Sequence, residues 1–265
     1  MSKIDFTGRV AIVTGAGAGL GRCYALELAK RGAKVVINDL GGTRDGVGSD
    51  SSAANKVVEE IKALGGQAVP NYDNVATVAG GANIVKTAVD AFGKVDILIN
   101  NAGILRDKSF TKMEEENWDS VMNVHLKGAY CVSRPAFEVM RANNYGRIIM
   151  TTSGAGLFGN FGQSNYSAAK AGVAALTPVA GVAGLAPARR AAAADGALAA
   201  AAAGVGLAGL VGHAGAGRLV EAELAAARGA LGRRDAAGER RGGARIGQAG
   251  IGGAAARAVG VVALR

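Results

Sequence analysis

The chain has 265 residues, of which 49% are hydrophobic, so it is long enough and apolar enough to bury the core of one sizeable domain. Its formal net charge of +9 is concentrated late in the chain, because residues 174–265 contain eleven arginines and only five acidic residues. Residues 1–173 contain no basic stripe interleaved with aromatic residues, so the charge does not indicate a nucleic-acid partner.

Short β-branched runs alternate with longer helical patterns, which is typical of βαβ units and a parallel sheet. The expected strands are Arg9–Thr14, Lys34–Asp39, Gln67–Tyr72, Val95–Asn100 and Arg147–Thr151. The expected helices between them are Leu20–Arg31, Ala53–Leu64, Val78–Phe92 and Glu115–Asn143. Right-handed crossovers then give an α/β fold, a doubly wound parallel sheet of the Rossmann type with helices on both faces.

The sequence TGAGAGLG at Thr14–Gly21 directly follows the first expected strand and opens the first expected helix. Gly15 supplies the tight turn, Gly19 the close approach of the backbone to a pyrophosphate, and Gly21 the close packing of helix on strand. The helix N-terminus adds free N–H groups for anionic phosphates. This context indicates a nucleotide-binding loop. The alternative is a glycine-rich turn that binds nothing.

Asp39 closes the second expected strand, roughly 20 residues after the glycine loop. A carboxylate there accepts hydrogen bonds from both adenosine ribose hydroxyls and repels a 2′-phosphate, so we expect NAD rather than NADP. Arg22 and Arg44 are nearby cations that would soften this preference. The alternative is an ordinary aspartate that caps a turn.

Tyr166 and Lys170 stand four residues apart, which places them on one face of a helix, about 5–6 Å apart at Cβ. A free phenol loses its proton only near about pH 10, and a neighbouring ammonium favours the phenolate. Tyr166 can then take the proton of an alcohol while a hydride leaves the same carbon. Ser153, just after the fifth expected strand, is placed to hold the substrate oxygen. A tyrosine and a lysine at this spacing are usually structural when they occur alone. Their combination with the glycine loop, Asp39 and Ser153 indicates a nicotinamide-dependent oxidoreductase.

The composition changes abruptly near Val173, beyond which there is no Lys, Ser, Asn, Phe, Tyr, Trp, Cys or Met. We expect one Rossmann-type domain over 1–265, in which 1–172 carries the recognisable pattern and 173–265 is rich in Ala, Gly and Arg. A GC-rich gene translated out of frame would give this composition, and an authentic Ala-rich helical tail is the alternative; translation of the neighbouring frames distinguishes them. Val259–Leu264 has the composition of a strand.

The remaining composition indicates no metal and no membrane. Cys23 and Cys131 are too few for a disulfide framework or a cysteine metal site, so we expect buried, reduced thiols and a cytoplasmic location. Residues 1–15 have no apolar segment of the kind that a signal peptide contains. The apolar run 196–212 is mostly Ala and Gly and is shorter than the roughly 20 residues that a membrane span needs.

Together these residues resemble the short-chain dehydrogenase/reductase family, through Thr14–Gly21, the sequence NNAG at Asn100–Gly103, Asn123, Ser153, Tyr166 and Lys170. The resemblance implies that Asn123 holds a water in a proton relay through Lys170, whereas His125 is expected to be a packed helix histidine rather than a second base. It also implies a set of cofactor-binding residues: Gly15, Gly19, Leu20, Gly21, Asp39, Asp73, Asn74, Val75, Asn101, Gly103, Tyr166 and Lys170.

A narrower resemblance rests on the glycine-rich insertion after the second strand and on the sequences NNAGILRDKSF, YGRIIMTTS and GNFGQSNYSAAKAG. These are similar to the (3R)-hydroxyacyl-CoA dehydrogenase domains of peroxisomal type 2 multifunctional enzymes and of stand-alone bacterial relatives. The resemblance implies oxidation of a 3-hydroxyacyl-CoA by NAD, activity on steroid-like alcohols, and a homodimer or homotetramer. It extends to about residue 175.

Two other interpretations stay open. The first is an NADPH-dependent reductase of 3-ketoacyl or steroid substrates, against which Asp39 counts. The second is a cofactor-binding protein without turnover, because the residues after 175 contain no recognisable substrate lid.

Overall fold

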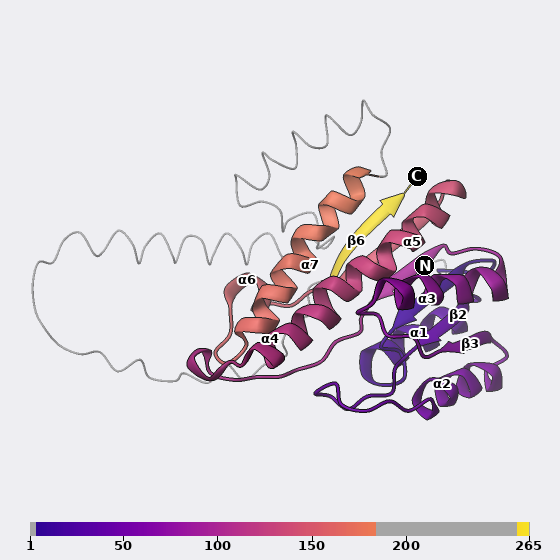
Figure 1. Cartoon of the computed structure of the whole chain (residues 1–265). Coiled ribbons are helices and arrows are strands. Elements are labelled where there is room, and N and C mark those ends of the chain that lie inside the picture. Colours follow the sequence, from indigo (N-terminus) through magenta and orange to yellow (C-terminus); the bar gives the residue numbers. More distant parts are fainter. Residues whose placement is uncertain (1–3, 184–258, 265) are drawn as a thin grey trace, which may run out of the picture. The chain divides into compact units, whose positions relative to one another are not determined.

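The computed structural model describes residues 4–183 and 259–264, which belong to one compact unit made of Met1–Asp195 and Ala256–Arg265 (Figure 1). Most of the Ala/Gly/Arg-rich segment, including the run 196–212, lies outside the described residues. The single domain over 1–265 therefore stays a prediction.

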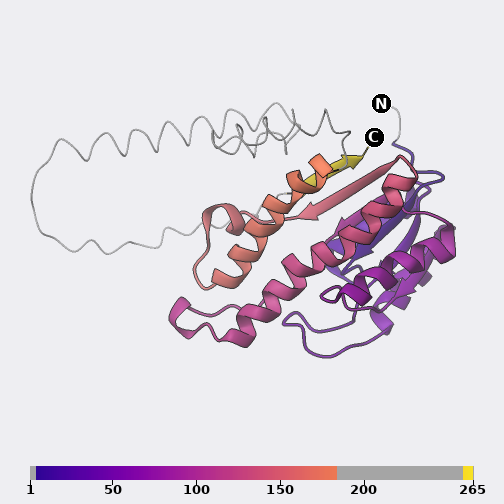
Figure 2. The same ribbon diagram turned by 45° about the horizontal axis from the view of Figure 1, so that its top comes forward.

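A mixed sheet forms the centre of the described fold, in the strand order β3-β2-β1-β4-β5-β6. Strands β1 to β5 are mutually parallel, and β6 pairs antiparallel with β5 (Figure 2). The strand order reverses between β1 and β4, which is where an open α/β sheet forms a crevice at the carboxyl ends of its strands. The strands are β1 (Val10–Thr14), β2 (Lys34–Asn38), β3 (Gln67–Asn71), β4 (Ile97–Asn100), β5 (Gly146–Thr151) and β6 (Val259–Leu264).

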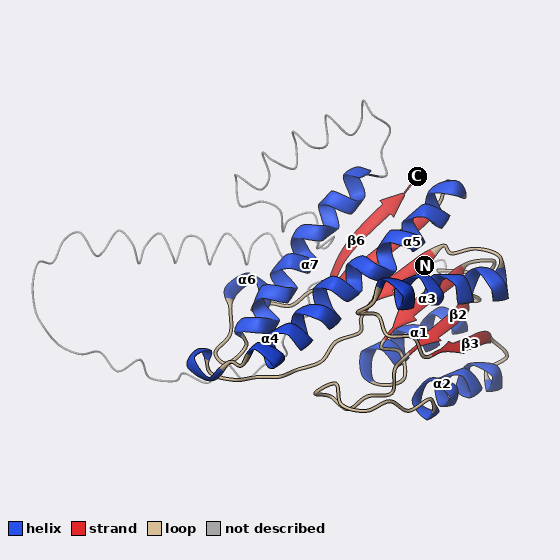
Figure 3. Ribbon diagram, in the orientation of Figure 1, coloured by secondary structure: helices blue, strands red, loops and turns tan. Residues whose placement is uncertain are grey.

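Helices cover both faces of this sheet, so the predicted doubly wound α/β fold is confirmed (Figure 3). One buried cluster packs α1 (Gly19–Lys30) and α2 (Ser52–Ala63) against the side chains of β1 and β2. The other packs α3 (Val78–Phe92), α5 (Gly128–Ala142) and α7 (Ser164–Ala183) against the opposite face. The central strands are buried on both faces, which explains their continuous apolar sequence. The shorter helices are the 3-10 turn Phe110–Lys112, α4 (Glu115–Met122) and α6 (Ala155–Phe158).

The expected continuous α-helix over Glu115–Asn143 is wrong in its middle. The chain forms α4, then the π-helical turn η2 (Asn123–Lys127), then α5. In this turn the N–H of Gly128 donates to the carbonyl of Asn123, five residues earlier. Such a turn holds one extra residue, so it rotates the side chains that follow relative to a regular helix.

Both cysteines are free thiols. Cys131 is buried on α5, as expected, whereas the expected burial of Cys23 is wrong because α1 turns that residue to solvent. Among residues 4–183 and 259–264, no cluster of His, Cys, Asp and Glu side chains is arranged to hold a metal ion. In the same part of the chain, no helix is both long enough and apolar enough to span a membrane.

Helices α3 and α5 approach each other closely at Gly81. A Cβ atom at this position would overlap the carbonyl oxygen of Cys131. Pro135 lies inside α5 and has no N–H to offer that carbonyl, four residues earlier. The absence of a side chain at Gly81 therefore lets α3 seat against α5, the helix that continues from η2.

We expect Gly81→Ala to lower the free energy of unfolding by about 1–3 kcal/mol, because the methyl group forces the two helices apart. This loss would outweigh the gain of up to about 1 kcal/mol in helix propensity from alanine. Urea unfolding followed by circular dichroism measures the change. The exposed Ala82→Ser is the control and should change stability by less than about 0.5 kcal/mol. A Gly81→Ala protein as stable as the wild type would contradict this account of the helix contact.

Candidate active site

The segments that carry the predicted site residues leave the sheet at its carboxyl edge. The glycine loop follows β1, Asp39 follows β2, Asp73 follows β3, Asn101 follows β4 and Ser153 follows β5. Because the five strands are parallel, these segments meet along one edge, on both sides of the point where strand order reverses.

The glycine loop fits a phosphate-bearing ligand in three ways. Gly15 has φ +63°, and its Cα faces Ala102 so closely that a Cβ would lie 2.8 Å from the Ala102 Cα. Gly21 packs against the carbonyl of Gly15, where a side chain would overlap it. Gly19 has φ +54° and open space where its side chain would be, so the backbone itself forms the surface there.

The N-terminus of α1 offers hydrogen-bond donors to an anion. The helix begins at Gly19, and its N-cap residue Ala18 makes no side-chain hydrogen bond to it. The first turn, which includes Leu20, contains no acidic residue. Backbone N–H groups of a helix start that lack such a cap bind phosphate well. The loop and the helix start together fit a dinucleotide diphosphate.

Asp39 lies against the glycine loop. One carboxylate oxygen accepts the N–H of Gly17 at 2.7 Å, and the other accepts the N–H of Gly41 at 2.8 Å. Each oxygen keeps a second lone pair for a ribose hydroxyl. Arg22, one of the two cations near this position, forms an ion pair with Glu60.

The segment after β3 is held by amide side chains. Asn38 donates to the backbone carbonyl of Asp73 at 2.9 Å, and the Asp73 carboxylate accepts from Asn71 at 2.7 Å and Asn83 at 3.1 Å. Asn74 caps the turn by accepting the N–H two residues later. Val75 is 8% exposed and joins the core beneath the crevice.

Asn101 ties the loop after β4 to the glycine loop. Its side-chain amide donates to the carbonyls of Thr14 and Gly15, both at 3.0 Å. The hydroxyl of Thr14 in turn accepts the N–H of Asn101 at 3.0 Å and the N–H of Ala102 at 3.1 Å. Gly103 then lies against the ring of His125, where a Cβ would overlap the imidazole.

The predicted catalytic residues come from β5 and α7. Lys170 is 4% exposed, and its Nζ donates to the carbonyl of Thr151 at 2.6 Å. The same Nζ lies 5.6 Å from the centre of the Tyr166 ring, so the two side chains share one side of the helix as predicted. Tyr166 is half-buried in the first turn of α7. Ser153 is also half-buried, and its Oγ accepts the N–H of Ala155 at 3.2 Å.

Asn123 and His125 both lie in η2 but have different surroundings. Asn123 is exposed, and the structure does not bring it to the cavity beside Lys170. His125 is 5% exposed and lines that cavity. The relay role of Asn123 therefore stays a prediction without geometric support, whereas Val124 and His125 are the residues of this turn that line the cavity.

The surroundings of His125 keep its imidazole neutral. Burial, followed by the positive charge of Lys170, lowers the pKa of His125 to about 3. Its Nε2 lies 3.1 Å from the backbone nitrogen and 2.8 Å from the carbonyl oxygen of Ile104, and the tautomer decides which of these bonds forms. The ring packs edge-on against Tyr166, with 5.1 Å between ring centres and 89° between ring planes. This agrees with a packed histidine and not with a second base.

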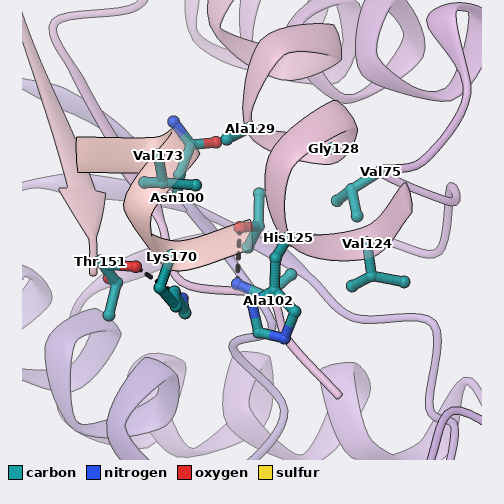
Figure 4. A pocket seen from close by; sticks show the side chains of 11 residues that line it. Val75, Asn100, Ala102, Val124, His125, Gly128, Ala129, Thr151, Lys170 and Val173 are labelled. Atoms are coloured by element: carbon teal, nitrogen blue, oxygen red, sulfur yellow. Dashed lines mark hydrogen bonds between the residues drawn. The ribbon is translucent and has the colours of Figure 1, made fainter. Parts of the chain in front are cut away.

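A small cavity lies between these groups (Figure 4). Lys170 and Thr151 line one side of it, and His125 and Val124 line another. The space open to the centre of a water molecule is about 10 Å³, close to the minimum for one water.

Asn165 is a residue of this site that the sequence analysis missed. It is 0% exposed, and its amide donates to the carbonyls of Arg106 at 3.0 Å and Asn117 at 2.9 Å. It thereby fixes the start of α7, next to Tyr166, to the segment after β4 and to α4. The sequence signal for such anchoring is an asparagine directly before the motif tyrosine. The sequence does not identify the partners of the asparagine amide.

Comparisons with known proteins match the described part of the chain. The family model described as short chain dehydrogenase matches residues 9–183, and so ends shortly after the composition changes. A peroxisomal multifunctional enzyme A from Dictyostelium discoideum is 62% identical over 174 residues, which are 66% of this chain and 39% of that protein. A hydroxyacyl-CoA dehydrogenase from Mycobacterium tuberculosis is 42% identical over 185 residues, covering 65% of this chain and 56% of that protein.

A solved structure supports the same match. The crystal structure of a short chain dehydrogenase from Mycobacterium avium has a TM-score of 0.61 and 49% identity, over 66% of this chain and 62% of that chain. The chain thus spans less than two thirds of the length of each of these relatives. The resemblance inferred from the motifs is confirmed at the level of the family.

The burial of neutral His125 predicts that the fold loses stability in acid. An unfolded histidine takes up a proton below about pH 6.5, whereas the pKa of His125 in the fold is about 3. Between these values the unfolded chain binds more protons, so the free energy of unfolding falls as the pH falls, by up to about 1.4 kcal/mol per pH unit. We expect His125→Gln to reduce this slope, as measured by urea unfolding between about pH 7.5 and pH 5. Equal slopes for the two proteins would contradict the buried, neutral state.

Proposed function

The chain belongs to the short chain dehydrogenase family, and on that premise we propose that it oxidises the secondary alcohol of a 3-hydroxyacyl-CoA with NAD. The observation that carries the proposal is the convergence of Tyr166, Lys170 and Ser153 on the sheet edge that also bears the glycine loop. An acid–base pair and a loop that fits a dinucleotide at the same edge of the sheet support the proposal, because hydride transfer needs both near the substrate.

The proposed chemistry divides the alcohol's two hydrogens between protein and cofactor. A bound, oxidised nicotinamide supplies the acceptor for the hydride that leaves the carbinol carbon. Tyr166, as phenolate, takes the hydroxyl proton, so that the carbon–oxygen bond becomes a carbonyl. Lys170 supports the phenolate by its positive charge, which the Thr151 carbonyl holds in place. The Ser153 hydroxyl donates to the substrate oxygen and stabilises the charge that develops on it.

The preference for NAD over NADP rests on the charges around the ribose position. The Asp39 carboxylate lies against the glycine loop through its bond with Gly17, where it would repel a 2′-phosphate. Arg22 is already paired with Glu60 and is therefore less able to bind such a phosphate. The NADPH-dependent reductase thus stays the less favoured alternative.

The proposed substrate class rests on the relatives. One matched protein is named a hydroxyacyl-CoA dehydrogenase, and a more similar one is a peroxisomal multifunctional enzyme. The sequences quoted above for this resemblance surround Asn101 and Tyr166, close to the proposed chemistry. The homodimer or homotetramer, the steroid-like substrates and the cytoplasmic location stay predictions.

We expect the full chain to reduce NAD in the presence of a (3R)-3-hydroxyacyl-CoA, and we expect Tyr166→Phe to lower kcat by about 10²–10⁴-fold. The phenylalanine keeps the ring but cannot carry the proton, so the Kd for NADH should stay within about twofold, as measured by fluorescence titration. Tyr130→Phe, at an exposed tyrosine of α5, is the matched control and should keep wild-type kcat. Nearly full activity of Tyr166→Phe would refute the assigned base. NADH binding without turnover by the wild type would favour the cofactor-binding alternative.

We expect kcat/KM to be at least about 100-fold higher with NAD than with NADP, because like charges placed together cost several kcal/mol. Asp39→Asn removes the charge while it keeps the shape, and should reduce this ratio by about tenfold or more. Asp45→Asn, at an exposed aspartate of the insertion after β2, is the control for general charge effects. If the wild-type protein were as active with NADP as with NAD, the assignment of NAD as the cofactor would be refuted.

A further inference from the structure

We propose that His125 is a positioning residue, whose imidazole ring holds the Tyr166 ring in the orientation that proton transfer needs. This role rests on the proposed function, because it presupposes that Tyr166 is the base. It differs from the relay assigned by resemblance to Asn123, and from a role of His125 in proton transfer.

The contact between the two rings carries the proposal. Tyr166 is only half-buried and lies in the first turn of α7, so burial alone does not fix the rotation of its ring. The His125 ring meets it edge-on at 5.1 Å, an arrangement that aromatic pairs favour. The Lys170 ammonium lies 5.6 Å from the same ring centre. Within the described residues, His125 and Lys170 therefore both lie close to this ring and can fix how the phenol is turned.

His125 is itself held tightly enough to position another ring. Its Nε2 is bonded to the backbone of Ile104, at 3.1 Å or 2.8 Å depending on the tautomer. On the side of Gly103 there is no room even for a methyl group beside the imidazole. The π-helical turn η2 places the residue on the inner side of the helix, where it is 5% exposed. The ring edge that carries Cε1 and Nε2 thus lies against the backbone of Gly103 and Ile104.

The insertion after β2 supports the segment to which His125 is bonded. The N–H of Leu105 donates to the carbonyl of Arg44 at 3.0 Å, and the Nε of Arg106 donates to the carbonyl of Asp45 at 2.9 Å. These bonds fix the residues that follow Ile104. The orientation of the His125 ring is therefore tied to both the glycine-rich insertion and the loop after β4.

The charge state of His125 suits a positioning role. Two titratable side chains on the packed helix α7 face it, Tyr166 and Lys170. Burial and the charge of Lys170 keep the imidazole neutral at any pH at which the enzyme would work. A ring that stays neutral gives Tyr166 the same neighbour throughout the reaction.

Two substitutions separate the two contacts of the imidazole. His125→Gln keeps an amide that can bond to the Ile104 backbone but removes the ring from Tyr166. His125→Phe keeps a ring against Tyr166 but leaves the Ile104 backbone groups without their partner, which costs stability. Lys127→Gln, at an exposed residue of the same π-helical turn, is the matched control.

We expect His125→Gln to unfold at nearly the wild-type urea concentration at neutral pH and to lose about 10–100-fold in kcat, since small misplacements of a reacting group have effects of this size. Its KM and its Kd for NADH should stay within about twofold. The primary deuterium isotope effect on kcat, measured with substrate deuterated at the carbinol carbon, should rise as hydride transfer slows. This readout excludes misfolding as the cause, because a misfolded fraction of the protein would lower kcat without altering the isotope effect. His125→Phe should be less stable and keep kcat within about threefold of the wild type.

The outcome for His125→Gln decides the question even if His125→Phe fails to fold. Wild-type kcat with an unchanged isotope effect in His125→Gln would overturn the proposal. So would a fall in kcat that occurs in Asn123→Ala and not in His125→Gln. The proposed function fails separately, if Tyr166→Phe keeps its activity, whereas an inactive Tyr166→Phe and a fully active His125→Gln would refute only the positioning role.

Discussion

Two hydrogen bonds from one amide set the geometry on which the site depends. The side chain of Asn101 donates to the carbonyls of Thr14 and Gly15, both at 3.0 Å, and so joins the ends of β1 and β4 where the strand order reverses. A side chain on Gly21 would lie only 2.6 Å from the same amide nitrogen, so α1 can approach only because a glycine stands there. The protein itself thereby fixes the glycine loop and the loop after β4 in one arrangement.

From that junction a continuous set of contacts leads to the proposed base. The loop after β4 continues through Gly103 and Ile104, which hold the His125 ring, and that ring meets Tyr166. On the other side, Asn165 bonds the start of α7 to Arg106 of the same segment. The residues proposed to bind the dinucleotide and those proposed to move the proton are thus attached to one short stretch of backbone. Errors in its position would affect both functions together.

The sequence predicted whatever depends on local pattern. The apolar runs gave five strands with ends within about two residues of those observed, and the four-residue spacing placed Tyr166 and Lys170 on one side of a helix. It could not predict η2, because the extra residue of a π-helical turn is stabilised by tertiary packing and has no period of its own. Once such a turn occurs, the inward side of the helix no longer follows the regular period. This is why Asn123 is exposed and His125 is buried.

The placement of a neutral ring beside Lys170 has an electrostatic consequence for the whole site. A cation at His125 would lie in a poorly solvated space next to an existing ammonium, and both desolvation and repulsion oppose it. The cavity therefore carries one fixed positive charge, on Lys170, and that charge is held by the carbonyl of Thr151. In a medium of low dielectric constant a single, well-placed charge acts strongly on its neighbours. Electrostatic potentials add, so a second cation at His125 would change the potential at Tyr166. The neutral, buried imidazole instead leaves Lys170 as the charged side chain that lines the cavity in the part of the chain described by the structure.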